Sequence, residues 1–365
     1  MDTPELDRLR SQIAAVDRQI VELAARRSEL AAQIGEVKRS TGSDLRDFSR
    51  EKDVVGRARA VAAGAGLSED LAEKLMLALI RSSLVVQEQD QVRASSAGSG
   101  RSALVVGGLG HMGRWFVRFL ESQGFHVEIA DPGLGSDGPT SWNGTGKEFD
   151  IYVVATPLPV AASILEEMAA DPPNGLIFDI GSLKTPLRKG LEDLAARGAR
   201  VASIHPMFGA DTDLLSGRHI VLIDVGHRAA ADEARELFGS TMASIVEMDL
   251  DSHDRLIAYI LGLSHALNIA FFTALAESGE AASTLAELSS TTFDRQLAVA
   301  SQVAAENPGL YFEIQYLNRY GNESLEALST AVEHLRQLVE SGDSEGFTAL
   351  MNSGAAYLDE TMKRP

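Results

Sequence analysis

The chain has 365 residues, enough for two or three domains that each bury a core. Its 52 acidic residues against 33 lysines and arginines give a formal net charge of -19, which argues against a nucleic-acid partner. The absence of cysteine excludes disulfides and thiolate metal sites, and it fits the reducing cytoplasm. We find no run of about 18 apolar residues and no apolar segment behind the acidic N-terminus, so we expect neither a membrane helix nor a signal peptide.

Residues 6–37 predict one long helix. Apolar residues recur there at alternating intervals of three and four, as along one helix face. Arg27 stands where this pattern requires an apolar residue, and Lys38 follows eleven residues later on nearly the same face. A lone arginine at such a position is more often a snorkelling side chain or a device that sets the helix register. Two cations on one apolar face instead indicate a bound anion.

Two further helices are expected before residue 95. One begins near Asp47, and the next begins at Ser68, a residue typical of helix N-caps. On the last helix an apolar stripe continues as Ser83 and Gln87, which share one face. Buried polar groups need partners, and a bound anion would satisfy them.

The position of Arg10 predicts a second chain. Arg10 precedes Lys38 by 28 residues, which is roughly 42 Å along one helix. If both side chains touch one small ligand, Arg10 must come from an antiparallel copy of the helix. This predicts an intertwined homodimer.

Residues 4–92 resemble the all-helical chorismate mutases. The resemblance rests on Leu9-Arg10, Asp17, Ala25-Arg26-Arg27, Gly35 to Lys38, Arg46-Asp47, Arg50-Glu51, Ser83 and Gln87. It implies that Arg27, Lys38 and Arg10 of the partner subunit hold the carboxylates and ether oxygen of chorismate. It also implies that Glu51 and the backbone near Asp47 take the hydroxyl. Arg50, Ser83 and Gln87 complete the implied pocket.

The chemistry of a Claisen rearrangement fits this set of residues. Such a reaction requires a folded substrate and a stabilised negative charge on the ether oxygen rather than a nucleophile. Gln87 suits this role because an amide donates a hydrogen bond at any pH. The alternative is a helical dimerisation or regulatory module whose charges form a solvated face.

A glycine-rich turn follows the helical segment. After a small-residue stretch at 94–100, an apolar strand at 103–106 leads into Gly107, Gly108, Leu109, Gly110, His111, Met112 and Gly113, and then into a helix. Such a turn lets the backbone approach a pyrophosphate at a helix N-terminus. Asp131 ends the next strand, where a carboxylate can accept the ribose 2′-hydroxyl and would repel a 2′-phosphate, so NAD is favoured over NADP. A structural glycine turn without a cofactor is the weaker alternative.

Further strands alternate with helices and predict a doubly wound sheet. Polar residues follow these strands at Thr156-Pro157, Gly181 to Lys184 and His205 to Gly209, and ligands bind at the carboxyl ends of such strands. From Asp251 onward the pattern is helical, and it contains His265 and Arg295. A lone histidine on an apolar helix is more often a core residue, whereas a buried arginine there usually pairs with an anion.

Residues 102–345 resemble prephenate dehydrogenase, above all at Gly107–Gly113, Gly181–Lys184 and His205–Gly209. The resemblance implies that His205 takes the proton of the 4-hydroxyl while hydride leaves for NAD, and that Ser182 holds this hydroxyl and the imidazole. It also implies that Arg295 binds a substrate carboxylate, with His265 and Lys184 orienting substrate and cofactor. Neither reaction requires a metal.

The complete interpretation is a bifunctional enzyme of tyrosine biosynthesis. We expect an all-α domain at 1–92, a linker at 93–102, a Rossmann-like α/β domain at 103–249 and an all-α substrate and dimerisation domain at 250–365. Chorismate and prephenate are the expected substrates, although arogenate stays open, and L-tyrosine is a candidate feedback inhibitor. The alternatives are a dehydrogenase with a non-catalytic mutase-like module, a β-hydroxyacid dehydrogenase and a nucleotide-sensing protein without catalysis.

Overall fold

The computed structural model describes residues 4–362 and divides into two compact units. The first unit extends to Met248, apart from the short segments Pro157–Pro159 and Ser182–Arg188. These two segments belong to the second unit, which continues from Asp249.

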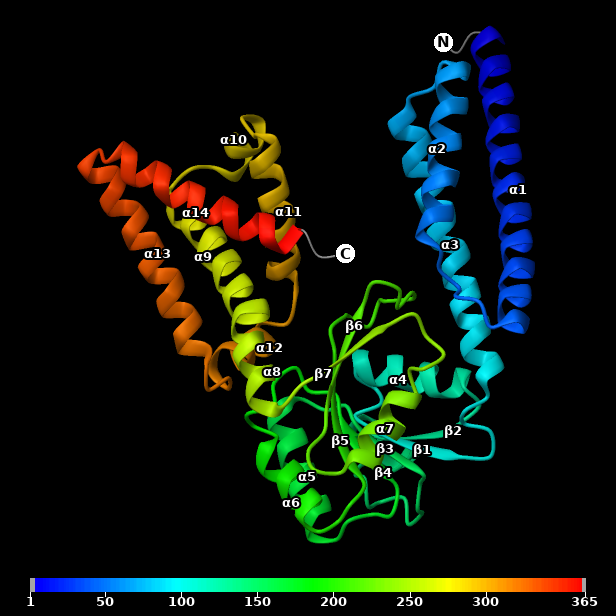
Figure 1. Cartoon of the computed structure of the whole chain (residues 1–365), viewed down its shortest axis with the longest axis vertical. Coiled ribbons are helices and arrows are strands. Elements are labelled where there is room, and N and C mark those ends of the chain that lie inside the picture. The colour runs from blue at the N-terminus through cyan, green and yellow to red at the C-terminus, as the bar shows by residue number, and fades with distance from the viewer. Residues whose placement is uncertain (1–3, 363–365) are drawn as a thin grey trace. The chain divides into compact units, whose positions relative to one another are not determined.

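Three helices open the first unit, as the sequence predicts: α1 (Pro4–Thr41), α2 (Phe48–Ala65) and α3 (Glu69–Ser95) (Figure 1). Asp47 caps α2 by accepting the Arg50 N–H, and Ser68 caps α3 by accepting the Leu71 N–H. The apolar stripe of α1 stays exposed, and Ile13 and Leu23 are 62% and 65% accessible. In one copy of the chain, therefore, α1 leaves a long apolar face uncovered.

A seven-stranded sheet forms the rest of this unit, in the order β2-β1-β3-β4-β5-β6-β7. The strands are β1 (Ser102–Val106), β2 (His126–Ala130), β3 (Ile151–Val154), β4 (Leu176–Asp179), β5 (Val201–Pro206), β6 (His219–Ile223) and β7 (Ser244–Glu247). Every pair is parallel except β5 with β6. The segment between β5 and β6 contains no helix, so β6 returns antiparallel. Sequence patterns predict neither this reversal nor β7.

Helices lie between the strands as a doubly wound sheet requires. They are α4 (His111–Ser122), the short η1 (Pro132–Asp137), α5 (Leu158–Ala170), α6 (Arg188–Ala196) and α7 (Arg228–Glu236). Aromatic residues of α4 pack into the core of the sheet, with Phe116 completely buried.

The mutase-like helices pack against the sheet domain within the first unit. Ile80 and Leu84 of α3 form an apolar cluster with Leu214, which lies between β5 and β6. Beside them the Glu88 carboxylate accepts the backbone N–H groups of Leu215 at 2.7 Å and Met242 at 2.5 Å. Glu88 is only 3% exposed, and burial raises its pKa although both N–H groups oppose this.

The second unit is helical, as the sequence predicts. It contains α8 (Leu250–Ile257), the π-helical η2 (Ala258–Leu263), α9 (Ser264–Glu277), α10 (Ala282–Glu287), α11 (Thr291–Ala305), α12 (Pro308–Tyr316), α13 (Gly321–Ser341) and α14 (Ser344–Met362). The stretch Leu250–Glu277 is continuously helical over 28 residues and contains an 18-residue window with a mean hydropathy of 1.7, so by length and composition alone it could cross a membrane. Polar residues are interspersed along it, so it contains no uninterrupted apolar run.

Candidate active sites

The first candidate site lies between α1 and α3. The Arg27 guanidinium is half-buried, and its Nη1 donates to the Ser83 hydroxyl at 2.7 Å and to the Leu79 carbonyl oxygen at 2.8 Å. Burial lowers the pKa of Arg27, but an arginine keeps its charge at physiological pH. The polar residues that interrupt the two apolar stripes therefore meet at one place.

Gln87 lies one helical turn beyond Ser83 on α3. Its Nε2 donates to the carbonyl oxygen of Ala31 on α1 at 2.5 Å. The two helices approach this closely because residue 35 is glycine: a Cβ there would lie 2.8 Å from Gln87 Cγ. Sequence reasoning gave Gly35 no role of its own, and the structure shows that it makes room for the Gln87 side chain.

Lys38 and Asp47 lie on either side of the connection between α1 and α2. The Lys38 ammonium donates to the carbonyl oxygen of Leu45 at 2.7 Å. The Asp47 carboxylate accepts the Ser49 hydroxyl at 2.7 Å and the Arg50 N–H at 3.0 Å, and these bonds lower the pKa of Asp47. The side chain of Asp47 is thus engaged in capping, whereas the expected substrate contact at this position involves the backbone.

Glu51 has a cationic partner in the chain itself. Arg46 donates to both of its carboxylate oxygens, at 2.9 and 3.0 Å. The same guanidinium donates to the Ser216 hydroxyl of the sheet domain at 2.7 Å. A hydroxyl that binds Glu51 must therefore share the carboxylate with Arg46. The Arg50 side chain is exposed.

Arg10 lies near the opposite end of α1 from Lys38. Its side chain is exposed and pairs with Asp7 at 3.7 Å. The separation of roughly 42 Å along the helix keeps it away from the pocket of its own chain. A contribution of Arg10 to the site stays a prediction that requires a second copy.

The glycine turn after β1 has the close packing that a dinucleotide cradle requires. Gly107 has a positive φ of 83°, and a Cβ there would lie 2.7 Å from the Ala155 carbonyl oxygen. A Cβ on Gly108 would lie 2.7 Å from Ile129, and one on Gly113 would lie 2.1 Å from the Gly107 carbonyl oxygen. Gly110 then occupies the N-cap of α4 with no side chain over the helix terminus. The backbone N–H groups at this end are therefore open to a phosphate.

Two further groups support a cofactor at this turn. The Thr156 hydroxyl oxygen after β3 is buried and has no hydrogen-bond partner among residues 4–362. The Asp131 carboxylate accepts the N–H groups of Leu109 at 3.1 Å and Gly133 at 2.9 Å, so it lies directly beside the turn. His111 and Met112 form the first turn of α4, and Pro157 follows Thr156. The residues present fit NAD.

The ends of β4 and β5 bring together three buried polar residues. Asp179 is completely buried and accepts the Ser203 hydroxyl at 2.5 Å and the Gly181 N–H at 2.8 Å. His205 lies two residues after Ser203 on β5 and is 5% exposed. Sequence reasoning found His205 but missed Asp179, whose only signal was an acidic residue at the end of an apolar strand.

The second unit holds Ser182 and Lys184 on the segment Ser182–Arg188. The Asp254 carboxylate of α8 accepts the Lys184 N–H at 2.8 Å and both the N–H and hydroxyl of Thr185 at 2.5 Å. His253 Nδ1 lies 2.7 Å from the same carboxylate. Burial favours a raised pKa for Asp254, but the hydrogen bonds from His253, Thr185 and Lys184 outweigh it and lower the pKa. Asp254 therefore organises the segment that carries Ser182 and Lys184, a role that sequence reasoning missed.

His265 and Arg295 lie on α9 and α11 of the second unit. The His265 ring lies 4.2 Å from the Tyr311 ring, and burial lowers the pKa of His265. Its Nδ1 is buried without a partner among the described residues, which favours a ligand contact over a core role. The expectation of a buried Arg295 is wrong for one copy of the chain, because Arg295 lies exposed in the first turns of α11.

Three family models match the chain. Chorismate mutase type II matches residues 9–88, the nucleotide-binding domain of prephenate dehydrogenase matches 121–247, and its dimerization domain matches 249–353. The chain is 31% identical to 4-amino-4-deoxyprephenate dehydrogenase of Streptomyces pristinaespiralis over 271 residues, which are 70% of this chain and 91% of that protein. The chain belongs to the prephenate dehydrogenase family.

Similarity to other members of this family includes the mutase region. The T-protein of Enterobacter agglomerans is 28% identical over 371 residues, which cover 99% of this chain and 95% of that protein. A prephenate dehydrogenase from Aquifex aeolicus, solved with hydroxyphenyl propionate and NAD⁺, has the same fold, with a TM-score of 0.55 at 19% identity over 71% of this chain and 98% of that one. The resemblances to chorismate mutases and to prephenate dehydrogenase that the sequence showed are both confirmed.

Proposed function

We propose that this member of the prephenate dehydrogenase family catalyses two consecutive reactions of tyrosine biosynthesis. The first rearranges chorismate to prephenate, and the second converts prephenate and NAD to 4-hydroxyphenylpyruvate. The observation that carries the proposal is the similarity to a T-protein along 99% of the chain, because that similarity runs through both candidate sites. The product of the first reaction is the substrate of the second.

The mutase reaction requires only that the substrate is held in a folded conformation and that its transition-state charge is stabilised. Arg27 and Lys38, with Arg10 of the partner subunit, bind the carboxylates and fold the enolpyruvyl group over the ring. Gln87 and Lys38 then stabilise the negative charge that grows on the ether oxygen. The hydrogen bond of Arg27 to Ser83 supports this assignment, since it holds the guanidinium in place before substrate binds.

In the dehydrogenase, the glycine turn at Gly107–Gly113, Thr156 and Asp131 would hold NAD, which accepts a hydride when it is bound. His205 removes the proton of the prephenate 4-hydroxyl as the hydride leaves C4. The ring is then a dienone, and loss of carbon dioxide restores its aromaticity.

The remaining residues of the dehydrogenase site orient the substrate. Ser182 holds the reacting hydroxyl, and Arg295 binds a carboxylate by charge-assisted hydrogen bonds. Lys184 and His265 position substrate and cofactor. The exposed state of Arg295 in one copy leaves its guanidinium available for such an anion.

We further propose that the enzyme works as a homodimer in the cytoplasm. The exposed stripe of α1 and the apolar stretch Leu250–Glu277 supply two faces for a second copy. The second face lies in the part matched by a dimerization domain, so a protein partner explains its apolar residues without a membrane. L-Tyrosine remains the proposed feedback inhibitor.

Coupled assays on the full chain test the proposal. NADH formation is followed with chorismate, prephenate or arogenate, together with chorismate consumption. Lys38→Ala should abolish NADH formation from chorismate and spare it from prephenate. His205→Asn should abolish NADH formation from both and spare chorismate consumption. If either substitution removes both activities in a folded protein, the assignment of two separate sites is wrong. If Lys38→Ala still consumes chorismate at the normal rate, the mutase-like domain is non-catalytic or uses other residues.

A further inference from the structure

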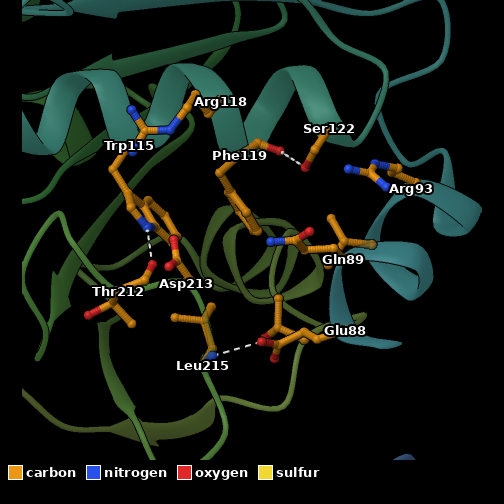
Figure 2. A pocket seen from close by; sticks show the side chains of 12 residues that line it. Glu88, Gln89, Arg93, Trp115, Arg118, Phe119, Ser122, Thr212, Asp213 and Leu215 are labelled. Carbon is orange, nitrogen blue, oxygen red and sulfur yellow. Dashed lines mark hydrogen bonds between the residues drawn. The ribbon is translucent and has the colours of Figure 1, made fainter. Parts of the chain in front are cut away.

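Three consecutive residues of the sheet domain contact the mutase-like helices. They lie in the connection between β5 and β6, and they are Leu214, Leu215 and Ser216. We call them the 214–216 segment. Leu214 joins the apolar cluster of α3, and the Leu215 N–H donates to the buried Glu88 carboxylate at 2.7 Å (Figure 2). Ser216 reaches the connection between α1 and α2, where it bonds to a charged side chain.

The sheet domain holds the 214–216 segment in place. Just before the segment, the carbonyl oxygen of Thr212 accepts the indole N–H of the buried Trp115 at 3.0 Å (Figure 2). The Leu215 side chain lies in the main core of the sheet, and its carbonyl oxygen accepts the Arg218 N–H at 2.8 Å. The backbone is therefore bonded on both sides of Ser216. A side chain on such a rigid support can fix the position of a group that contacts it.

The charged partner of Ser216 is Arg46, which also holds Glu51. Nε and Nη2 of Arg46 donate to the two Glu51 carboxylate oxygens at 2.9 and 3.0 Å, and Nη1 donates to the Ser216 hydroxyl oxygen at 2.7 Å. The Arg46 Cζ atom also lies 4.3 Å from the centre of the Phe48 ring. A planar guanidinium that is bonded along two edges and stacked on a ring is restrained against rotation.

We propose that Ser216 is a positioning residue of the mutase site, although it belongs to the sheet domain. Ser216 fixes the Arg46 guanidinium, and Arg46 in turn fixes the Glu51 carboxylate. The resemblance to chorismate mutases assigns this carboxylate to the substrate hydroxyl, so the role of Ser216 rests on the proposed mutase activity. A carboxylate has about four lone-pair sites, and the bidentate bond with Arg46 uses two of them. Two sites remain for the hydroxyl.

The neighbouring contact of the 214–216 segment supports the same role. Glu88, which accepts the Leu215 N–H, directly follows Gln87, the amide proposed to stabilise the ether oxygen. Gln87 lies on α3 and Glu51 lies on α2, so the two groups come from different helices. Adjacent residues of one rigid segment thus hold both helices. The sheet domain thereby sets the relative position of two groups that the mutase reaction uses.

The kinetic effect of removing the Ser216 hydroxyl follows from what Glu51 binds. The substrate hydroxyl takes no part in the Claisen rearrangement, so its contact is the same in the ground state and the transition state. Loss of such uniform binding raises KM and leaves kcat unchanged. Ser216→Ala should therefore raise the mutase KM for chorismate about two- to tenfold, the effect of one lost hydrogen bond. NADH formation from prephenate should stay normal.

Steady-state kinetics of the full chain with chorismate measure this effect. Ser216→Thr keeps the hydroxyl and should keep the natural KM. Ser122→Ala is the matched control, since Ser122 is a half-buried serine of the sheet domain whose hydroxyl donates to the Phe119 carbonyl oxygen at 2.7 Å, within its own helix (Figure 2). Ser216→Ala added to Arg46→Met should raise KM no further than Arg46→Met alone, because Ser216 acts through that guanidinium.

The possible outcomes separate this role from a structural one and from the proposed function. A natural KM in Ser216→Ala overturns the inference alone, provided that the natural chain consumes chorismate. A lower kcat with an unchanged KM, together with slower NADH formation from prephenate, shows a loss of folded protein and also overturns it. A natural chain that does not consume chorismate overturns the proposed mutase activity and this role with it.

Discussion

The contact of Glu88 with the sheet domain can be tested by removing its carboxylate. In Glu88→Ala the N–H groups of Leu215 and Met242, now held at 2.7 and 2.5 Å, lose their acceptor. A buried hydrogen-bonding group left unpaired costs about 1–3 kcal/mol, so two such groups set a range of about 2–6 kcal/mol. Because Glu88 lines a cavity between α3 and α4, water can enter and accept a hydrogen bond from part of the unpaired N–H groups. We therefore expect the free energy of unfolding to fall by about 2–4 kcal/mol.

Urea unfolding followed by tryptophan fluorescence measures this effect. Trp115 is one of only two tryptophans and lines the same cavity, so its emission reports on the contact between α3 and the sheet domain. Glu88→Gln keeps one acceptor oxygen and should lose about half as much stability. Glu121→Ala, at an exposed position on α4, is the control and should change stability by less than about 0.5 kcal/mol. If the free energy of unfolding of Glu88→Ala equals that of the control, the buried carboxylate does not hold the mutase-like helices and the sheet domain together.

Three further outcomes follow from the same geometry. Because the pKa of Glu88 is raised on folding, the proton-linked part of its contribution to stability is fully present below the unfolded pKa of about 4.3 and is lost as pH rises through the folded pKa. The stability of the natural protein relative to Glu88→Gln should therefore fall with rising pH in that window, and a flat difference contradicts the assignment. Gly35→Ala should displace the Gln87 amide, since the new Cβ would lie 2.8 Å from Gln87 Cγ. The mutase kcat should therefore fall while NADH formation from prephenate stays normal. An unchanged mutase kcat would contradict this role of Gly35. Gly113→Ala should raise the Kd for NAD measured by calorimetry, because its Cβ would lie 2.1 Å from the Gly107 carbonyl oxygen; a normal Kd would show that the turn does not cradle the cofactor.

Local patterns in the sequence were enough to predict the three opening helices, the glycine turn and most strands of the sheet. Helix periodicity, the caps at Asp47 and Ser68, and the spacing of the glycines after the first strand depend on residues close together in the chain. The sequence also singled out Arg27, Ser83 and Gln87, since polar residues interrupt otherwise apolar faces.

Only the tertiary structure decided the contacts between distant residues. It showed that the Glu88 carboxylate accepts the N–H of Leu215, 127 positions later in the chain. It also showed that the Asp254 carboxylate accepts the N–H of Lys184, 70 positions earlier. The structure further showed that β6 runs antiparallel to β5 and that the Arg295 side chain is exposed. Nothing in the local sequence marks Glu88 or Asp254 as different from a solvated acidic residue on a helix. The reason is physical: burial of a carboxylate is stabilising only when N–H groups from elsewhere in the fold reach it, and the fold alone brings them there.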